Sequence, residues 1–129
     1  MPAARKVMSR NLLTVAPGIS VEDVAQRMVS RDVGAALVTE GERLMGIVTE
    51  RDVLRAVARG IDESTLVADL MTREPETMEP DESTQHAATL MIHGGFRHLP
   101  IVEDGEVVGI LSIRDLMRVV LGDSAPRGA

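Results

Sequence analysis

The chain of 129 residues contains no cysteine, no tryptophan and no tyrosine, and Phe96 is its single aromatic residue. Without cysteine there is no thiolate nucleophile, no disulfide, and no zinc or iron–sulfur site with cysteine ligands. Without aromatic rings there is no platform on which the bases of a single-stranded nucleic acid could stack. A planar ligand would therefore have to lie against aliphatic side chains and backbone.

Excess positive charge and long apolar runs are also missing. The formal net charge is −6, whereas proteins that bind nucleic acids present a basic surface to the phosphates. No apolar run approaches the roughly 18 residues of a membrane-spanning helix, and the first ten residues lack the apolar stretch of a signal peptide. We therefore expect a cytoplasmic protein that binds neither nucleic acid nor membrane.

What the chain does contain is a repeat. The motif GIVTERD at 46–52 returns as GILSIRD at 109–115, an offset of 63 residues (109 − 46). At that offset, residues 7–57 align with 70–120 without a gap. Two copies indicate a paired module rather than a solenoid. We expect repeat 1 at 1–60, repeat 2 at 61–122 and a flexible tail at 123–129.

Each copy predicts the order strand, helix, strand, strand, helix. Ser20 and Ser83 begin the first helices as N-caps, and Gly60 and Gly122 end the second ones. Glycine-containing turns between short apolar runs predict hairpins. The elements of the first copy are strands at 13–15, 35–38 and 44–49 and a last helix at 50–59; those of the second are strands at 99–102 and 107–112 and a last helix at 113–121.

Apolar residues at helical spacing predict the core faces. They are Val21, Val24, Ala25, Met28 and Val29 in the first copy and Thr84, Ala87, Ala88, Met91 and Ile92 in the second. A half of this size buries little core alone, so we expect an α+β fold in which two βαββα repeats pack by pseudo-twofold symmetry into one compact pair. A dimer face is predicted from further apolar residues on the last helices: Leu54, Val57, Leu116, Val119 and Val120.

The repeated motif has two interpretations. Thr49 and Ser112 fall at helix N-cap positions, and Asp52 and Asp115 follow three residues later, which is the pattern of a structural capping box. A helix N-terminus also attracts phosphate, and a carboxylate one turn into the helix can accept hydrogen bonds from ribose hydroxyls. The duplication, with an arginine before each aspartate, favours a pair of ribonucleotide sites.

The chain resembles the tandem CBS domain pair, or Bateman module, over roughly residues 5–121. The resemblance depends on the motif glycine, two aliphatics, Thr or Ser, two residues, Asp, which occurs twice. Supporting matches are VMSRN at 7–11, LMTRE at 70–74 and FRHLPIVEDGEVVGI at 96–110. The resemblance implies βαββα repeats, dimers of the pair, and adenosine-type ligands in clefts between the repeats: AMP, ADP, ATP, and sometimes NAD or S-adenosylmethionine.

The resemblance also implies roles for individual residues. Asp52 and Asp115 would hold ribose, and Thr49 and Ser112 would meet the first phosphate. The remaining ribose and phosphate candidates are Arg51, Arg114, Arg97 and His98, and the candidates for the purine walls are Val15, Ala16, Gly34, Ala35, Met78 and Glu79.

The two sites are predicted to be unequal. Arg97 and His98 precede Leu-Pro in the second copy, at the family's basic position. The first copy has Gly34 and Ala35 there, without a basic residue.

These observations predict a regulatory sensor that acts on an unknown protein partner through the conformation of a homodimer. The adenine nucleotide would be a regulatory ligand, with no catalytic cofactor. The alternative is a structural or interaction protein with a degenerate or single functional pocket. No nucleophile–base pair is apparent, so we do not expect an enzyme. Nor do we expect a metal site, because His86 and His93 are about 10.5 Å apart along one predicted helix and His98 falls in a strand.

Overall fold

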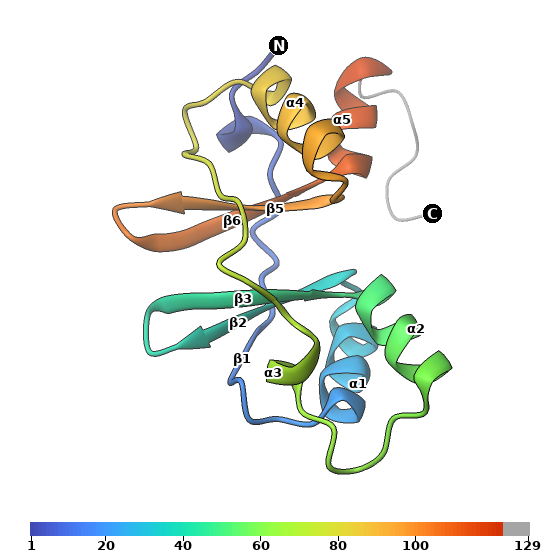
Figure 1. Ribbon diagram of the computed structural model, residues 1–129. Coiled ribbons are helices and arrows are strands. Elements are labelled where there is room, and N and C mark those ends of the chain that lie inside the picture. The colour runs from blue at the N-terminus through green and yellow to red at the C-terminus, as the bar shows by residue number, and fades with distance from the viewer. Residues whose placement is uncertain (123–129) are drawn as a thin grey trace. The chain divides into compact units, whose positions relative to one another are not determined.

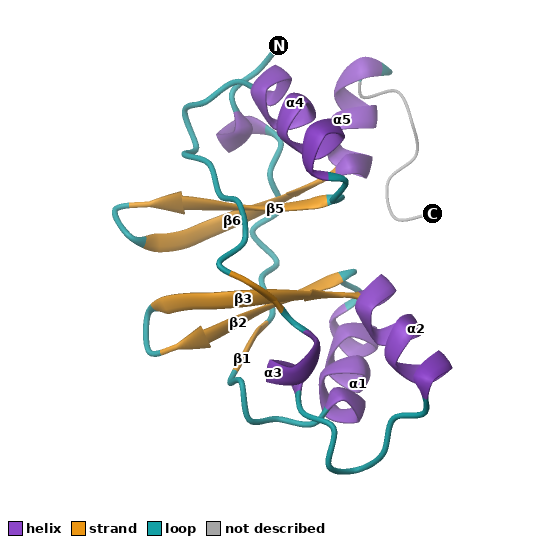
Figure 2. Cartoon of the chain, in the orientation of Figure 1, coloured by secondary structure: helices purple, strands orange, loops and turns teal. Residues whose placement is uncertain are grey.

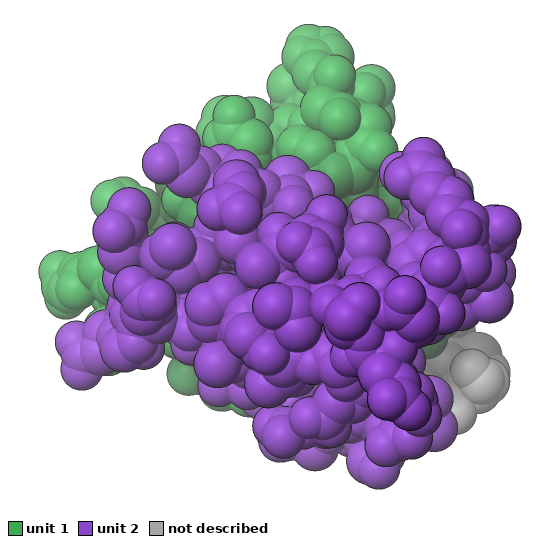
Figure 3. Space-filling model, turned by 60° about the horizontal axis from the view of Figure 1, so that its bottom comes forward, with its two compact units in different colours: residues 1–10, 76–129 green, residues 11–75 purple. Residues whose placement is uncertain are grey.

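The computed structural model describes residues 1–122, which form two compact units (Figure 3). Unit 2 consists of residues 11–75, and unit 1 combines residues 1–10 with the described residues from 76 onward. The unit boundaries, after residues 10 and 75, differ from the predicted repeat boundary after residue 60. The predicted tail at 123–129 lies outside the described residues.

Unit 2 is a four-stranded sheet with its helices. Along the chain it contains β1 (Thr14–Val15), α1 (Val21–Arg31), β2 (Ala35–Glu40), β3 (Arg43–Thr49), α2 (Glu50–Arg59), α3 (Val67–Leu70) and β4 (Thr72–Arg73). The strand order is β1-β2-β3-β4. β1 is parallel to β2, and the other neighbours are antiparallel. Helices α1 and α2 lie on the same side of this sheet (Figure 1).

Unit 1 repeats this plan with shorter pairings. It contains a 3₁₀ turn η1 (Ala4–Lys6), α4 (Thr84–Gly94), β5 (His98–Glu103), β6 (Glu106–Ser112) and α5 (Ile113–Val120). β5 and β6 form an antiparallel hairpin, with α4 and α5 on one side of it (Figure 2). Single bridges join Met78 to Ile101 and Ser9 to Ile110, at the positions that β1 and β4 occupy in unit 2. The predicted α+β class and the doubled strand–helix pattern are confirmed.

The local signals act as the sequence predicts. Ser20 Oγ accepts a hydrogen bond from the Asp23 amide, and Ser83 Oγ accepts one from the Gln85 amide, so both first helices are capped. Gly60 ends α2 with a left-handed φ of 83°, a conformation that glycine adopts without a steric penalty.

Each unit has its own apolar core. Val24, Met28 and Val48 belong to the core of unit 2, and Met91, Leu99 and Leu111 belong to that of unit 1. The buried stripe of each first helix is narrower than predicted: Val21, Val24 and Met28 on α1, and Thr84, Ala87 and Met91 on α4.

The predicted burial is wrong for Val29 and Ile92, and the predicted exposure is wrong for Leu116. Val29 and Ile92 are exposed instead of buried, because each lies one residue, or about 100°, beyond the last buried position of its helix. Leu116 is buried at 4% exposure and contributes to the unit 1 core, so it is not available to a dimer face.

The N-terminal segment of each predicted repeat packs into the unit formed mainly by the other repeat. α3 and β4 complete unit 2, where β4 pairs with β3. Residues 1–10 complete unit 1, where the buried Thr84 donates to the Pro2 carbonyl through both its amide and its hydroxyl, each at 2.9 Å. The sequence pattern predicts neither α3 nor η1, because both are too short for a periodic pattern.

Close packing at glycine secures these segments. A Cβ built on Gly46 would lie 2.7 Å from both Met71 Sδ and the Thr72 carbonyl oxygen. A Cβ on Gly109 would overlap the side chain of Met8. The glycine of the repeated motif therefore allows the segment that contains the methionine to approach the strand closely.

We predict that Gly46→Ala lowers the free energy of unfolding by about 1–3 kcal/mol, because the new methyl group must displace backbone as well as Met71. Urea denaturation measures the change. Gly18→Ala is the matched control, since a Cβ there meets nothing within 4 Å. Equal stability of the two variants would contradict the packing argument.

Candidate functional site

The repeated motif forms a capping box at the start of each last helix. Asp52 Oδ2 accepts hydrogen bonds from the Thr49 amide at 2.8 Å and the Thr49 hydroxyl at 3.1 Å. In return, the Asp52 amide donates to Thr49 Oγ1 at 3.3 Å. Ser112 and Asp115 repeat the arrangement at 2.8, 3.0 and 3.2 Å. The structural interpretation of the motif is confirmed, and it occupies one carboxylate oxygen of each aspartate.

Further candidate site residues lie at the start of the neighbouring strand, next to the N-terminus of each capped helix. In unit 2 the Glu50 amide donates to the Gly34 carbonyl at 3.0 Å, and Ala35 is paired with Thr49. Gly34 and Ala35 are therefore neighbours of the first capping box.

Unit 1 has the same geometry with different side chains. The Ile113 amide donates to the Arg97 carbonyl at 2.9 Å, and His98 is paired with Ser112. The side chain of Arg97 is exposed, whereas that of His98 is half-buried. The basic residues of the second copy thus lie beside the second capping box.

The structure does not bring the other predicted purine walls to the capping box of the same unit. Val15 is paired with Val38, three residues along β2 from Ala35 or about 10 Å, and its side chain belongs to the core. Met78 is likewise a core residue, while Ala16 and Glu79 are exposed. Their role as purine walls stays a prediction.

Met78 and Glu79 also line a hollow of about 600 Å³ on unit 1. Glu79, Glu82 and Asp104 are acidic and no basic residue lines the hollow among the described residues. This surface would repel an anionic ligand.

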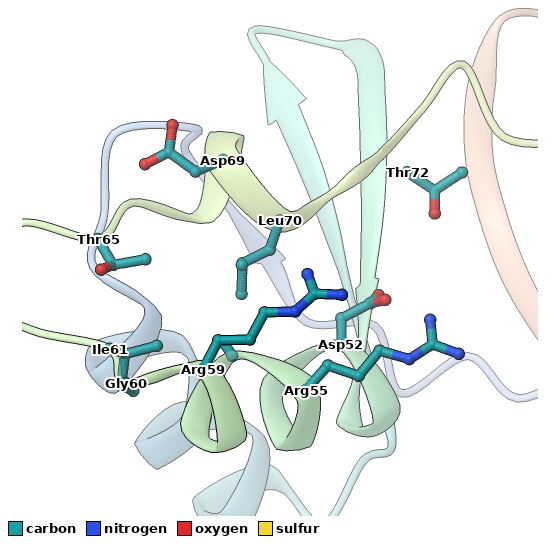
Figure 4. Close-up of a pocket in the computed structure, with 10 residues that line it drawn as sticks. Asp52, Arg55, Arg59, Gly60, Ile61, Thr65, Asp69, Leu70 and Thr72 are labelled. Atoms are coloured by element: carbon teal, nitrogen blue, oxygen red, sulfur yellow. The ribbon is translucent and has the colours of Figure 1, made fainter.

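Unit 2 has a pocket of about 400 Å³ beside α2 (Figure 4). Asp52, Arg55, Ala56 and Arg59 come from one helix face, at spacings of three, four and seven residues. The rest of the wall comes from the loop after α2 and from α3 and β4: Gly60, Ile61, Thr65, Asp69, Leu70 and Thr72. The wall thus combines charged and hydroxyl side chains with the aliphatic side chains of Ala56, Ile61 and Leu70.

Hydrogen bonds order the loop that closes this pocket. Asp62 Oδ1 accepts from the Ser64 hydroxyl at 2.5 Å and from the Ser64 amide at 2.8 Å. These bonds, and weaker ones from Thr65, hold the pKa of the exposed Asp62 carboxyl below its usual value. The loop between α2 and α3 is therefore a defined wall.

Apart from Asp52, the residues that line this pocket were not among the predicted site residues. The available signal was LMTRE at 70–74, because it includes Leu70 and Thr72 and aligns with VMSRN at 7–11. What the sequence did not show is that this segment packs onto the preceding repeat.

The two aspartates differ in their second carboxylate oxygen. Asp115 Oδ1 forms an ion pair with Arg118 at 3.4 Å. Asp52 Oδ1 accepts no hydrogen bond from any residue in the range 1–122. Asp52 is half-buried at the pocket wall, so its carboxylate can accept hydrogen bonds from a ligand there. Arg51 and Arg114 are exposed on the first turns of their helices.

Residues 1–122 offer neither a metal site nor a membrane-spanning helix. No group of three or more histidine, aspartate or glutamate side chains is arranged to hold a metal ion there, and His86 lies 3.5 Å from Glu82. No helix in this part of the chain has the length and apolar character needed to cross a bilayer.

The duplicated fold and capping boxes match a known family. The chain belongs to the CBS domain family, whose pattern matches residues 4–59 and again 67–122. MJ1225 of Methanocaldococcus jannaschii is 32% identical over 122 residues, which cover 94% of this chain and 44% of that protein. The chain therefore spans less than half the length of this relative.

Solved structures of CBS proteins share the fold. PAE2072 from Pyrobaculum aerophilum, complexed with AMP, has a TM-score of 0.84 at 30% identity, covering 94% of this chain and 96% of that one. The CBS domain pair of MJ0100, in complex with 5′-methylthioadenosine and S-adenosyl-L-methionine, also has a TM-score of 0.84, at 26% identity and coverages of 96% and 99%.

We predict that Thr49→Ala lowers the free energy of unfolding by about 1 kcal/mol, because the variant loses the hydroxyl that accepts from the Asp52 amide. Thr49→Ser keeps that hydroxyl and should cost much less. Urea denaturation of both variants measures the difference. An unchanged stability for Thr49→Ala would mean that the capping box contributes nothing to the fold.

Proposed function

We propose that this chain is a regulatory module that binds an adenosine-type ligand at the Asp52 pocket and signals its presence to a protein partner. The observation that carries the proposal is the free Oδ1 of Asp52, which is half-buried at the wall of a polar pocket. An ionised carboxylate with an open oxygen can accept a hydrogen bond from a ribose hydroxyl.

The ligand class is supported by the related structures. PAE2072 is complexed with AMP, and the MJ0100 pair with 5′-methylthioadenosine and S-adenosyl-L-methionine. Their common part is adenosine, which presents a ribose to a carboxylate and a flat base to aliphatic side chains. In this chain Asp52 offers the carboxylate, and Ile61 and Leu70 offer aliphatic surface. AMP, ADP, ATP, NAD and S-adenosylmethionine remain the candidates.

A second candidate function is a protein with a single working pocket. It is favoured by the Asp115–Arg118 ion pair, in which the second carboxylate oxygen is already occupied. A ligand at this position would have to compete with Arg118. Binding at Asp52 alone would therefore be compatible with the geometry.

We further propose a homodimer formed through the helices. Exposed apolar side chains recur at equivalent positions of the two units, 63 residues apart: Val29 and Ile92 at 81% and 75% exposure, Leu54 and Met117 at 69% and 58%, and Val57 and Val120 at 57% and 77%. A surface patch that is present twice can meet its own copy in a symmetric interface. A regulatory role without catalysis, and a cytoplasmic location, remain parts of the same proposal.

We predict that an adenine nucleotide raises the melting temperature of the protein. At about one hundred times its dissociation constant a ligand adds roughly 2.7 kcal/mol, which corresponds to a rise on the order of 10 °C for a domain of this size. A thermal-shift panel with AMP, ADP, ATP, NAD and S-adenosylmethionine measures it.

Two variants locate the effect. Asp52→Asn keeps an oxygen for the helix cap but removes the charge that ribose hydroxyls would meet, so it should abolish most of the rise. Asp115→Asn should abolish less, because that carboxylate is already paired with Arg118. A wild-type protein that fails to respond to all five ligands would refute the proposed function.

We predict that Leu54→Glu combined with Met117→Glu shifts the protein from dimer to monomer, because a desolvated glutamate opposes association of an apolar face. Sedimentation velocity at several concentrations measures the change. Arg43→Glu, at an exposed position at the start of β3, is the control and should leave the dimer intact. A monomeric wild type would contradict the proposed homodimer.

A further inference from the structure

We propose that Arg55 and Arg59 form an anion-binding subsite of the Asp52 pocket, which makes unit 2 selective for adenosine ligands that carry phosphate. The inference rests on the proposed function and adds the ligand's charge to it. The capping box does not explain why two arginines point from the same helix face toward the pocket (Figure 4).

The spacing of the two arginines suits a phosphate. Arg55 and Arg59 are four residues apart, so their Cα atoms lie about 6 Å apart along α2. Both line the pocket in which Asp52 presents its free oxygen. A guanidinium group is planar and donates two parallel hydrogen bonds, a geometry that matches phosphate oxygens.

Neither arginine has a protein partner within residues 1–122, unlike several others in the chain. Arg5 pairs with Asp81 and Glu103, Arg27 pairs with Asp23, and Arg118 pairs with Asp115. Two neighbouring positive charges at helical spacing repel each other, and a bound anion would relieve that repulsion.

The carboxylates in the pocket do not occupy the donors of the two arginines. Asp52 Oδ2 accepts from the Thr49 amide at 2.8 Å, and Asp69 Oδ2 accepts from the Leu66 amide at 3.0 Å. Each carboxylate is therefore held by the start of its own helix, and neither forms an ion pair with Arg55 or Arg59 in the described part of the chain. The guanidinium donors remain available to a ligand.

The equivalent positions of unit 1 lack this arrangement. Arg118 is equivalent to Arg55 but is paired with Asp115, and Gly122 is equivalent to Arg59 and has no side chain. The subsite is thus confined to unit 2. Charge selectivity would distinguish the two units even if both bind adenosine.

Calorimetric titration with adenosine, AMP and ATP tests the subsite in an Asp115→Asn background, which weakens any contribution from unit 1. AMP should bind more tightly than adenosine, and the preference should decrease as salt screens the charges. The double variant Arg55→Gln, Arg59→Gln should lose about tenfold in AMP affinity, the order of one charge-assisted contact, and keep its adenosine affinity within about twofold. Arg43→Gln, which removes an exposed charge outside the pocket, should behave as the background does.

The possible failures are distinguishable. The subsite is refuted if the Asp115→Asn protein binds adenosine and AMP equally well. It is also refuted if the double variant keeps its preference for AMP. In both cases the proposed function stands. If neither adenosine nor AMP binds, and wild type also fails to bind them, the proposed function fails and the subsite falls with it. Circular dichroism of the double variant checks its folding, and a loss of adenosine binding together with AMP binding would point to a structural role for the arginines.

Discussion

The close contact of a glycine with a methionine organises both units. Gly46 lies against Met71, and Gly109 lies against Met8, with no room for a Cβ in either place. Each contact fastens the N-terminal segment of one predicted repeat to the sheet of the unit formed mainly by the other repeat. Since α3 and β4 are held in this way, Leu70 and Thr72 can form the wall opposite Asp52 in the unit 2 pocket. The glycine of the repeated motif therefore acts on the site indirectly, through the segment that it allows to approach.

The structural and functional interpretations of the motif concern different atoms of the same side chain. Asp52 Oδ2 closes the capping box, and this fixes the carboxylate at the start of α2. Oδ1 is left at the pocket wall without a partner among residues 1–122. A carboxylate held rigidly by backbone loses little conformational freedom when a ligand binds, so preorganisation favours affinity. Under the proposed function, the capping box would support recognition rather than be an alternative to it.

Periodic signals predicted the fold, and contacts distant in sequence decided most of the candidate site. The hairpins, the helix caps and the end of α2 at Gly60 follow from local residue patterns, and all are present. Val29 and Ile92 are exposed because only a narrow face of each first helix is buried. Helical spacing predicts that a face is buried but does not specify its width. The pocket wall from Leu70 and Thr72 depends on the exchange of short segments between repeats. No local pattern encodes that exchange, although the doubled VMSRN and LMTRE sequences marked the segments involved.

Duplication gave the two units the same aspartate, yet their surroundings make the aspartates chemically different. Asp115 is matched by Arg118 one turn further along α5, so its charge is largely satisfied within the helix. Asp52 has Arg55 at the equivalent place, but there the two side chains do not pair, and Arg59 adds a second positive charge to the pocket. A ligand with a ribose and a phosphate could complement both signs of charge at once in unit 2. In unit 1 the same ligand would first have to separate Asp115 from Arg118. Because that separation would cost free energy before any contact is gained, the ion pair itself would make the predicted affinities unequal, with no difference in the fold.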